Sequence, residues 1–235
     1  MPASEPGVAD PAGVLDTLLR QRHSCRAFLP RPVPRATIER IVEGAGRAAS
    51  WCNTQPWQLA VAGPAATDRF RTALMAHAAA AAGAGAGARE IAPDPVYRSV
   101  HLDRRRESGR LLYASVGVER GDQRGYAEQS ARNYALFDAP NVAILSCDRE
   151  LGPYGLIDCG AFIATLMLIA SSLGVASIAL ASTASYPEVV REHFAIADSH
   201  VIVSAIALGF TQADHPANGF RTSRVATDQV VTWFD

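Results

Sequence analysis

The 235-residue sequence contains no lysine, because all 22 of its basic residues are arginine. Chemistry that needs a lysine amine is therefore excluded, including Schiff bases, pyridoxal phosphate linkage and the Walker A loop. The net charge of −1 gives no overall positive field, so we expect no nucleic-acid partner. With 49% hydrophobic and 19% charged residues, the composition predicts a folded chain with a sizeable core.

Motifs for metal, disulfide and hydrolase chemistry are also missing. The sequence has no H-E-x-x-H and no G-x-S-x-G, and we expect no metal site. A nucleophile built from Cys52 and His23 is an alternative, although cysteine is more often a structural residue. The cysteines form no C-x-x-C pair, which argues against a disulfide framework and predicts a cytoplasmic location; they are Cys25, Cys52, Cys147 and Cys159.

The longest stretch without a charge, residues 161–182, is long enough to cross a membrane. Ser171, Ser172 and Gly174 interrupt it, so we expect a buried helix, a glycine stop and a buried strand, with no membrane partner. The first residues do not resemble a signal peptide. We interpret residues 1–12 as a disordered leader and residues 13–235 as a single domain.

Apolar periodicity and cap residues predict alternating helices and strands. We expect helices over about 11–21, 36–48, 64–82, 99–118 and 124–137, and from near 158 and 186 onward. We expect strands over 57–63, 141–147, 175–181 and 200–209. This order predicts an α+β domain of three layers, in which helices flank a mixed sheet of four or five strands. The Ala/Gly-rich stretch 78–88 is typical of a lid or hinge.

A cationic cluster lies just after the first expected helix. In an extended segment Arg22, Ser24 and Arg26 share one face, because alternate side chains point the same way. Two guanidinium groups and a hydroxyl on one face can bind a phosphate or carboxylate. A solvated basic face is the alternative on spacing alone.

A second polar segment, S-W-C-N-T-Q-P-W, spans residues 50–57 at the entrance to a strand. Its amides and hydroxyls could recognise the polar edge of a heteroaromatic ring. Taken alone, the same residues are also compatible with an ordinary turn.

Together these segments resemble the FMN-dependent nitroreductase family. R-H-S-C-R-A-F, residues 22–28, is similar to its N-terminal R-x-S-x-R motif, and residues 50–57 are similar to P-S-x-x-N-x-Q-P-W. Further similar pieces follow in the family's order at residues 158–161, 173–177, 186–191, 206–209 and 221–224. The resemblance implies a dimeric nitroreductase-like fold that binds FMN.

The resemblance also implies roles for particular residues. Arg22, Ser24 and Arg224 would hold the FMN phosphate, and Arg26 would lie near the pyrimidine edge of the flavin. Loop 50–55 would meet the flavin of the partner subunit, and the backbone at 179–182 would face flavin N5 and O4. The full set of expected cofactor-binding residues is Arg22, His23, Ser24, Arg26, Ser50, Trp51, Asn53, Gln55, Ala181, Ser182, Arg221 and Arg224.

Some positions depart from the family pattern. Ala49 stands where proline is usual, and Trp51 and Cys52 replace small residues. Trp51 would either belong to the core or narrow the pocket beside the flavin.

Residues 104–140 resemble the subgroup that reduces nitrobenzoate-like compounds. In that subgroup Tyr113, Asn133, Tyr134 and Phe137 would line the substrate channel, with helix packing as the alternative role for each.

The implied activity is ping-pong hydride transfer. NAD(P)H would reduce the flavin, and a nitroaromatic, a quinone or a similar electrophile would then take the electrons. No catalytic protein residue is needed, because flavin N5 carries the chemistry. The alternatives are a specialised enzyme of the same fold (a biosynthetic dehydrogenase or oxidase, or a reductive dehalogenase) and a flavin-binding redox protein without turnover.

Overall fold

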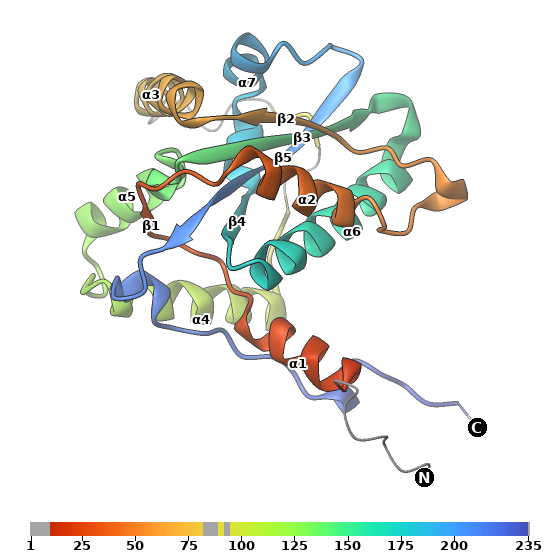
Figure 1. The fold of residues 1–235 in the computed structure, drawn as a ribbon. Helices are drawn as coiled ribbons and strands as arrows, with labels where there is room; N and C mark the ends of the chain where they lie inside the picture. Colours follow the sequence, from red (N-terminus) through yellow and green to blue (C-terminus); the bar gives the residue numbers. More distant parts are fainter. Residues whose placement is uncertain (1–9, 82–88, 92–94, 235) are drawn as a thin grey trace.

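A five-stranded sheet forms the centre of the domain (Figure 1). The computed structural model describes residues 10–81, 89–91 and 95–234. The strands are ordered β1 (Phe28–Leu29), β5 (His200–Thr211), β3 (Asn141–Asp148), β2 (Gln58–Ala62), and β4 (Ala176–Leu180) also pairs with β5. These strand pairs are antiparallel. Among the described residues, parallel pairing is limited to a bridge between Ser24 and Ser177, so the predicted strand number is confirmed while the sheet is far less mixed than expected.

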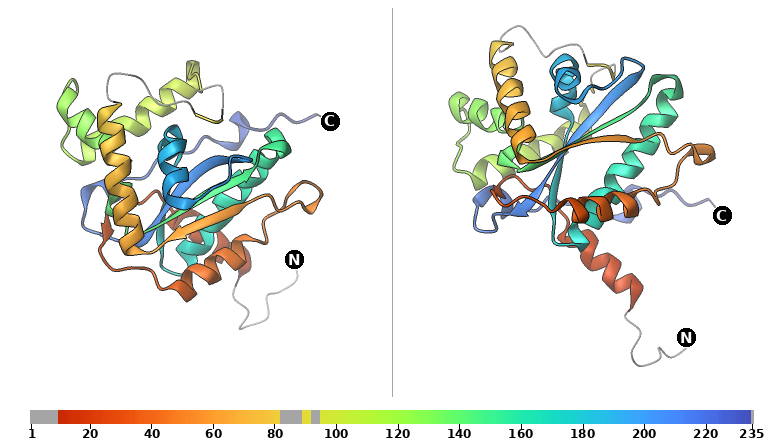
Figure 2. Two further views of the ribbon diagram at one scale, coloured as in Figure 1. Left: turned by 90° about the horizontal axis from the view of Figure 1, so that it is seen from above. Right: turned by 45° about the horizontal axis from the view of Figure 1, so that its top comes forward.

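Helices cover both faces of the sheet, which confirms the three predicted layers (Figure 2). One face carries α2 (Arg35–Ala45) and α6 (Gly152–Ser172), and the other carries α3 (Pro64–Ala80) and α7 (Pro187–Phe194). Because β3 and the middle of β5 are covered on both faces of the sheet, their sequences are nearly continuous runs of apolar residues.

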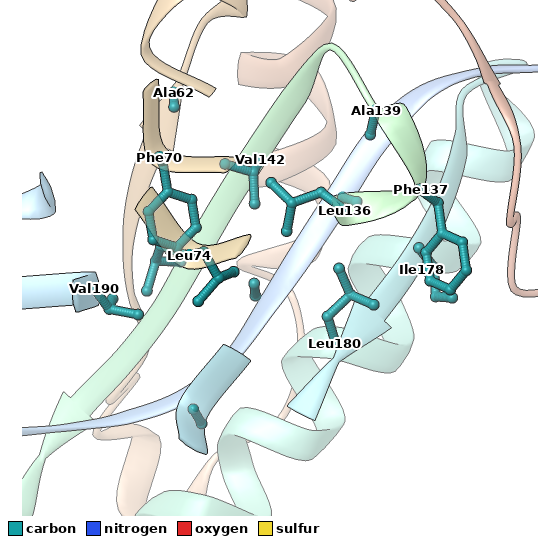
Figure 3. Close-up of a cluster of buried hydrophobic side chains, with 14 of the residues drawn as sticks. Ala62, Phe70, Leu74, Leu136, Phe137, Ala139, Val142, Ile178, Leu180 and Val190 are labelled. Atoms are coloured by element: carbon teal, nitrogen blue, oxygen red, sulfur yellow. The ribbon is translucent and has the colours of Figure 1, made fainter. Parts of the chain in front are cut away.

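Figure 3 shows how one of the two cores is built. Phe70 and Leu74 project from α3 and pack with Val190 of α7 over Val142 and Leu180 of the sheet. All five side chains are almost fully buried. Burial of this kind contributes about 1.5–3 kcal/mol for each large apolar side chain.

The remaining helices lie outside these layers: α1 (Pro11–Gln21), α4 (Ser99–Ser115) and α5 (Gln123–Ala131). Asp10 begins α1, because its carboxylate accepts hydrogen bonds from the backbone N–H groups of Ala12 and Gly13 at 3.1 and 3.0 Å. The last three residues of the expected leader are therefore the cap and first turn of a helix. Residues 1–9 lie outside the described part of the chain.

The charge-free stretch 161–182 has the structure expected of it. It contains the greater part of α6, a turn at Gly174 with φ of 71° and then β4. In the described residues one segment, Arg149–Ser172, is long and apolar enough to cross a membrane. Its side chains Phe162, Leu166 and Ala170 are buried against the sheet.

Some boundaries differ from the prediction. α6 begins at Gly152 rather than near Asp158, because Pro153 is accommodated in the first turn of the helix. The helix expected over 124–137 ends at Ala131, and the chain then turns through Leu136, Phe137 and Asp138, all with positive φ. Of the expected hinge 78–88, residues 78–80 end α3, and residues 82–88 lie outside the described residues.

Candidate functional site

The segment 22–27 runs beside β4 as an extended chain. The backbone N–H of Cys25 donates to the carbonyl oxygen of Ser177 at 3.1 Å, and Ser24 forms the bridge to the same residue. Cys25 is fully buried, whereas Arg22, Ser24 and Arg26 keep part of their surface exposed. The predicted alternation is therefore confirmed: the cysteine faces the core and the polar residues face outward.

A buried asparagine joins this segment to the C-terminal part of the chain. Asn218 accepts a hydrogen bond from the backbone N–H of Arg26 at 2.7 Å. Its Nδ2 donates to the carbonyl oxygens of Ala27 and Gln212, each at 2.9 Å. Sequence analysis missed Asn218, although its position in a Pro-Ala-Asn-Gly turn just before two arginines was a usable signal.

The asparagine brings together four arginines that we call the arginine cluster: Arg22, Arg26, Arg221 and Arg224. Burial, followed by the charge of Arg224, lowers the pKa of Arg22. Burial also lowers the pKa of Arg26. Residues nearly 200 positions apart in the sequence thus place positive charges at one site.

Backbone oxygens, rather than carboxylates, hold these guanidinium groups. Arg221 donates to the carbonyl oxygen of Asn218 at 2.8 Å, and Arg224 donates to the carbonyl oxygen of Ser223 at 2.7 Å. Nη1 of Arg26 donates to the carbonyl oxygen of Ser24 at 3.3 Å. Within the described residues no ion pair joins the arginine cluster to an acidic side chain, so its charge is available to an external anion.

His23 adds a buried acceptor to the cluster. Its Nδ1 lies 2.9 Å from the carbonyl oxygen of Gln21, which can only accept, so Nδ1 carries the hydrogen. Burial lowers the pKa of His23 most, and the charges of Arg221, Arg22 and Arg26 lower it further. The ring is therefore neutral at pH 7, and its buried Nε2 has no hydrogen-bond partner in the described part of the chain.

Two further polar atoms are buried without partners at the end of β4. The hydroxyls of Ser182 and Thr183 lie in the turn Ala181–Ser185 and have no hydrogen bond within the described residues. Buried polar groups are normally satisfied, so these hydroxyls are free to hydrogen-bond to a water molecule or a bound ligand. Ala181 and Ser182 are among the expected cofactor-binding residues, and they directly follow β4, the strand that runs beside Ser24.

The loop 50–55 is held by α6. The buried carboxylate of Asp158 accepts a hydrogen bond from the backbone N–H of Trp51 at 3.0 Å, and Ser50 Oγ accepts one from the backbone N–H of Gln55 at 3.0 Å. Cys52, Asn53 and Gln55 have φ near +50°. A loop of this conformation needs fixed anchors, and Asp158 is an anchor to which the sequence analysis had assigned no role.

Trp51 does not belong to the core, which excludes one of its two expected roles. Its side chain is 59% exposed, and its ring packs on the ring of Tyr154 with centroids 4.4 Å apart. Asn53 and Gln55 are also exposed. The loop therefore presents its polar groups and an aromatic ring outward.

The loop and the arginine cluster do not meet within one chain. Figures 1 and 2 show loop 50–55 at one end of the domain and the segment around Pro216–Asn218 toward the other. Within the described residues no hydrogen bond or ion pair joins the two. The expected flavin-binding residues thus form two separate groups.

The expected substrate residues are scattered. Tyr113 packs against Tyr126, with ring centroids 4.6 Å apart, at the edge of a groove along α4. Asn133 follows α5, where its amide donates to the carbonyl oxygen of Ser130 at 3.0 Å, and Tyr134 packs on Tyr186. Phe137 is only 3% exposed and belongs to the core, so in this chain it is a packing residue and not part of a channel surface.

Comparison with known proteins agrees with this arrangement. Residues 19–210 match the model of the Nitroreductase family. The chain belongs to the nitroreductase family. It is 31% identical over 209 residues to a 4-nitrobenzoate reductase of Pseudomonas putida, covering 89% of this chain and 90% of the relative. It is 33% identical over 223 residues to a 4-nitrobenzoate reductase of a Nocardioides species, covering 93% and 89% of the two chains.

A solved nitroreductase has the same fold. The structure of FMN-dependent nitroreductase NfnB from Mycobacterium smegmatis, in complex with NADPH, superposes with a TM-score of 0.89 at 27% identity. The match covers 96% of this chain and all of that chain. The nitroreductase fold predicted from the sequence motifs is confirmed.

The anchoring role of Asp158 can be tested by substitution. Asp158→Ala leaves the Trp51 N–H without its acceptor, so we expect the free energy of unfolding to fall by about 1–3 kcal/mol. Asp158→Asn keeps an amide oxygen and should lose less. Urea denaturation measures the difference, with Glu39→Ala as a control at an exposed ion pair on α2. Equal, small effects of Asp158→Ala and Glu39→Ala would contradict the role.

Proposed function

We propose that this nitroreductase-family protein is an FMN-dependent oxidoreductase. It takes electrons from NAD(P)H and passes them to a nitroaromatic, a quinone or a similar electrophilic acceptor. The observation that carries the proposal is the arginine cluster, which concentrates positive charge without an acidic partner in the described residues, next to buried polar atoms that lack partners. The printed names of the relatives, nitrobenzoate reductase and FMN-dependent nitroreductase, support the same activity.

The arginine cluster fits a phosphate dianion. Arg22, Ser24 and Arg224 would hold the FMN phosphate, because guanidinium groups bind phosphate oxygens through paired, charge-assisted hydrogen bonds. Burial and then the charge of Arg224 lower the pKa of Arg22, and a phosphate would offset both by supplying a negative charge. The neutral ring of His23 beside these groups can gain a proton and donate through Nε2 when an anion is bound.

Other residues fit the polar ring of a flavin. Arg26 would supply a fixed positive charge at the pyrimidine edge, where it favours the negative charge that gathers on reduction. The buried hydroxyls of Ser182 and Thr183 have unused hydrogen-bonding capacity at the adjoining strand end. When bound, FMN supplies a ring that accepts a hydride at N5 and passes the electrons on.

We also propose that the protein is a homodimer in which loop 50–55 completes the flavin site of the partner. The loop and the arginine cluster are far apart in one chain, as required if each flavin uses groups from both subunits. Leu15 and Leu19 of α1 are exposed, and Trp233 and Phe234 of the tail are 80% and 92% exposed. Apolar surface of this extent fits a shared interface.

A cytoplasmic location is the last part of the proposal. All four cysteines are free thiols, as expected for a protein of a reducing compartment.

The function is tested by the bound flavin and by turnover. We expect purified protein to be yellow, to release FMN rather than FAD on denaturation, and to oxidise NAD(P)H steadily when a nitroaromatic or quinone is supplied. Colourless protein that takes up no added FMN would refute the flavin site. Yellow protein that fails to turn over any acceptor class would support the non-catalytic alternative.

Replacement of Arg224 tests the phosphate contact. Arg224→Ala removes a charge-assisted hydrogen bond worth about 1.5–3 kcal/mol, so FMN affinity should fall about 10- to 150-fold. Turnover at saturating FMN should change little, because the phosphate is far from the reacting ring. Flavin titration beside a turnover assay measures both effects, and Arg69→Ala, an exposed arginine on α3, is the control. Unchanged FMN affinity would remove Arg224 from the site.

The dimer can be tested on α1. Light scattering should give twice the chain mass of 25.0 kDa. The double substitution Leu15→Asp and Leu19→Asp places charges on a face that is exposed in one chain, so it should dissociate the dimer and weaken FMN binding without unfolding the subunit. Arg20→Asp, on the polar side of the same helix, should leave the dimer intact. A monomer that retains FMN at full occupancy would contradict the shared site.

A further inference from the structure

We propose that a basic groove along α4 binds the 2′-phosphate of NADPH, so that NADPH rather than NADH is the reductant. The inference rests on the proposed function, since it concerns the electron donor of the same reaction. Its site is a groove of about 1690 Å³ between α4, the turn that follows it and the C-terminal segment at 222–225.

The two walls of the groove are tied together. Ser223 Oγ donates to the carboxylate of Glu107 on α4 at 3.2 Å. Arg224 lines the same groove and also interacts electrostatically with Arg22, so the groove begins at the arginine cluster. A molecule in the groove therefore lies next to the proposed flavin site.

The wall formed by α4 carries an excess of positive charge. Residues 103–110 contain four arginines against two acidic residues, Asp103 and Glu107; the arginines are Arg104, Arg105, Arg106 and Arg110.

Within this wall Arg106 and Arg110 are four residues apart in the helix, a spacing at which like charges repel. Both are exposed, and in the described residues neither forms an ion pair with a carboxylate. Because no carboxylate pairs with either guanidinium group in the described residues, both are available to an external dianion.

An aromatic pair lies in the same groove. The rings of Tyr113 and Tyr126 are 4.6 Å apart with an interplanar angle of 54°. The hydroxyl of Tyr126 accepts a hydrogen bond from the backbone N–H of Gly121 at 3.0 Å, which fixes the ring. Aromatic faces bind bases by stacking, so arginines and tyrosines together match an adenosine that bears a phosphate.

The size of the groove favours a dinucleotide over a small aromatic acid. A benzoate would fill a minor part of about 1690 Å³, whereas the adenosine half of NADPH extends well beyond the nicotinamide that must reach the flavin. NADH and NADPH differ only in the 2′-phosphate, so arginines that bind this group determine which of the two is used.

The test uses the FMN-loaded protein, in which the phosphate site of the arginine cluster is filled. Calorimetric titration compares adenosine 2′,5′-bisphosphate with 5′-AMP. We expect the bisphosphate to bind about tenfold more tightly or better, and the double variant Arg106→Ala/Arg110→Ala to abolish this difference. Arg69→Ala on α3 is the matched control, and Arg106→Lys/Arg110→Lys should retain part of the preference.

Steady-state kinetics separates the nucleotide from other anions. In the double alanine variant KM for NADPH should rise about tenfold, while KM for NADH and for 4-nitrobenzoate should stay constant. A rise confined to 4-nitrobenzoate would overturn the proposal and assign the groove to the acceptor. Equal binding of the two nucleotides by yellow, active wild-type protein would also overturn it, leaving the proposed function intact, whereas colourless protein would refute the function itself. Because both arginines are exposed, the visible flavin spectrum and thermal unfolding suffice to verify folding.

Discussion

The site depends on holding four arginines together without an acidic partner in the described residues. Like charges in a partly buried environment repel; burial lowers the pKa of Arg22 most, and the charge of Arg224 lowers it further. Carbonyl oxygens compensate part of the cost, and Asn218 connects the two segments that carry the charges. An anion that binds the folded chain but not the unfolded chain would raise the free energy of unfolding as its concentration exceeds its Kd, so FMN binding is linked to stability.

The pairing of the strands in the sheet brings the segments that carry these charges together. β5 pairs with β3 on one side and with β4 and β1 on the other. Segment 22–27 leads into β1 at Phe28, which pairs with Thr211, the residue at which β5 ends and the C-terminal segment begins. The close approach at this point requires Gly209, where an added Cβ would lie 2.7 Å from Phe28 and 2.9 Å from Pro140. Gly209, the last residue of the sequence motif at 206–209, thus allows the close packing of the strands next to the segments that carry the arginines.

Much of this was predictable from the sequence, for physical reasons. Strong apolar periodicity located the helices and four of the strands, and alternation in an extended segment separated Cys25 from the arginines. What the sequence did not reveal were features set by tertiary contacts. The turn at Leu136, Phe137 and Asp138 has positive φ without glycine, and it is stabilised from α3 by Arg71, which donates to Ala135 and Ala139. Its Phe137 therefore belongs to the core.

The same limit applies to the two anchors of the site. Asp158 and Asn218 act through hydrogen bonds to backbone groups 107 and 192 residues away in the sequence, at Trp51 and Arg26. No local pattern encodes such distances. The arginines themselves could be found, because a cluster of cations in an extended segment is a local signal.

Arg224 belongs both to the arginine cluster and to the lining of the groove, so a bound flavin phosphate affects how strongly the groove attracts a second anion. Once a phosphate is bound between Arg22 and Arg224, the charge of Arg224 is largely neutralised for a second anion. A nucleotide in the groove must then be attracted by the arginines of α4, which lie on the wall opposite Arg224. This explains why α4 carries positive charge beyond what one flavin phosphate needs. It also means that loss of Arg106 and Arg110 should affect the reductant, whereas loss of Arg224 should affect the flavin first.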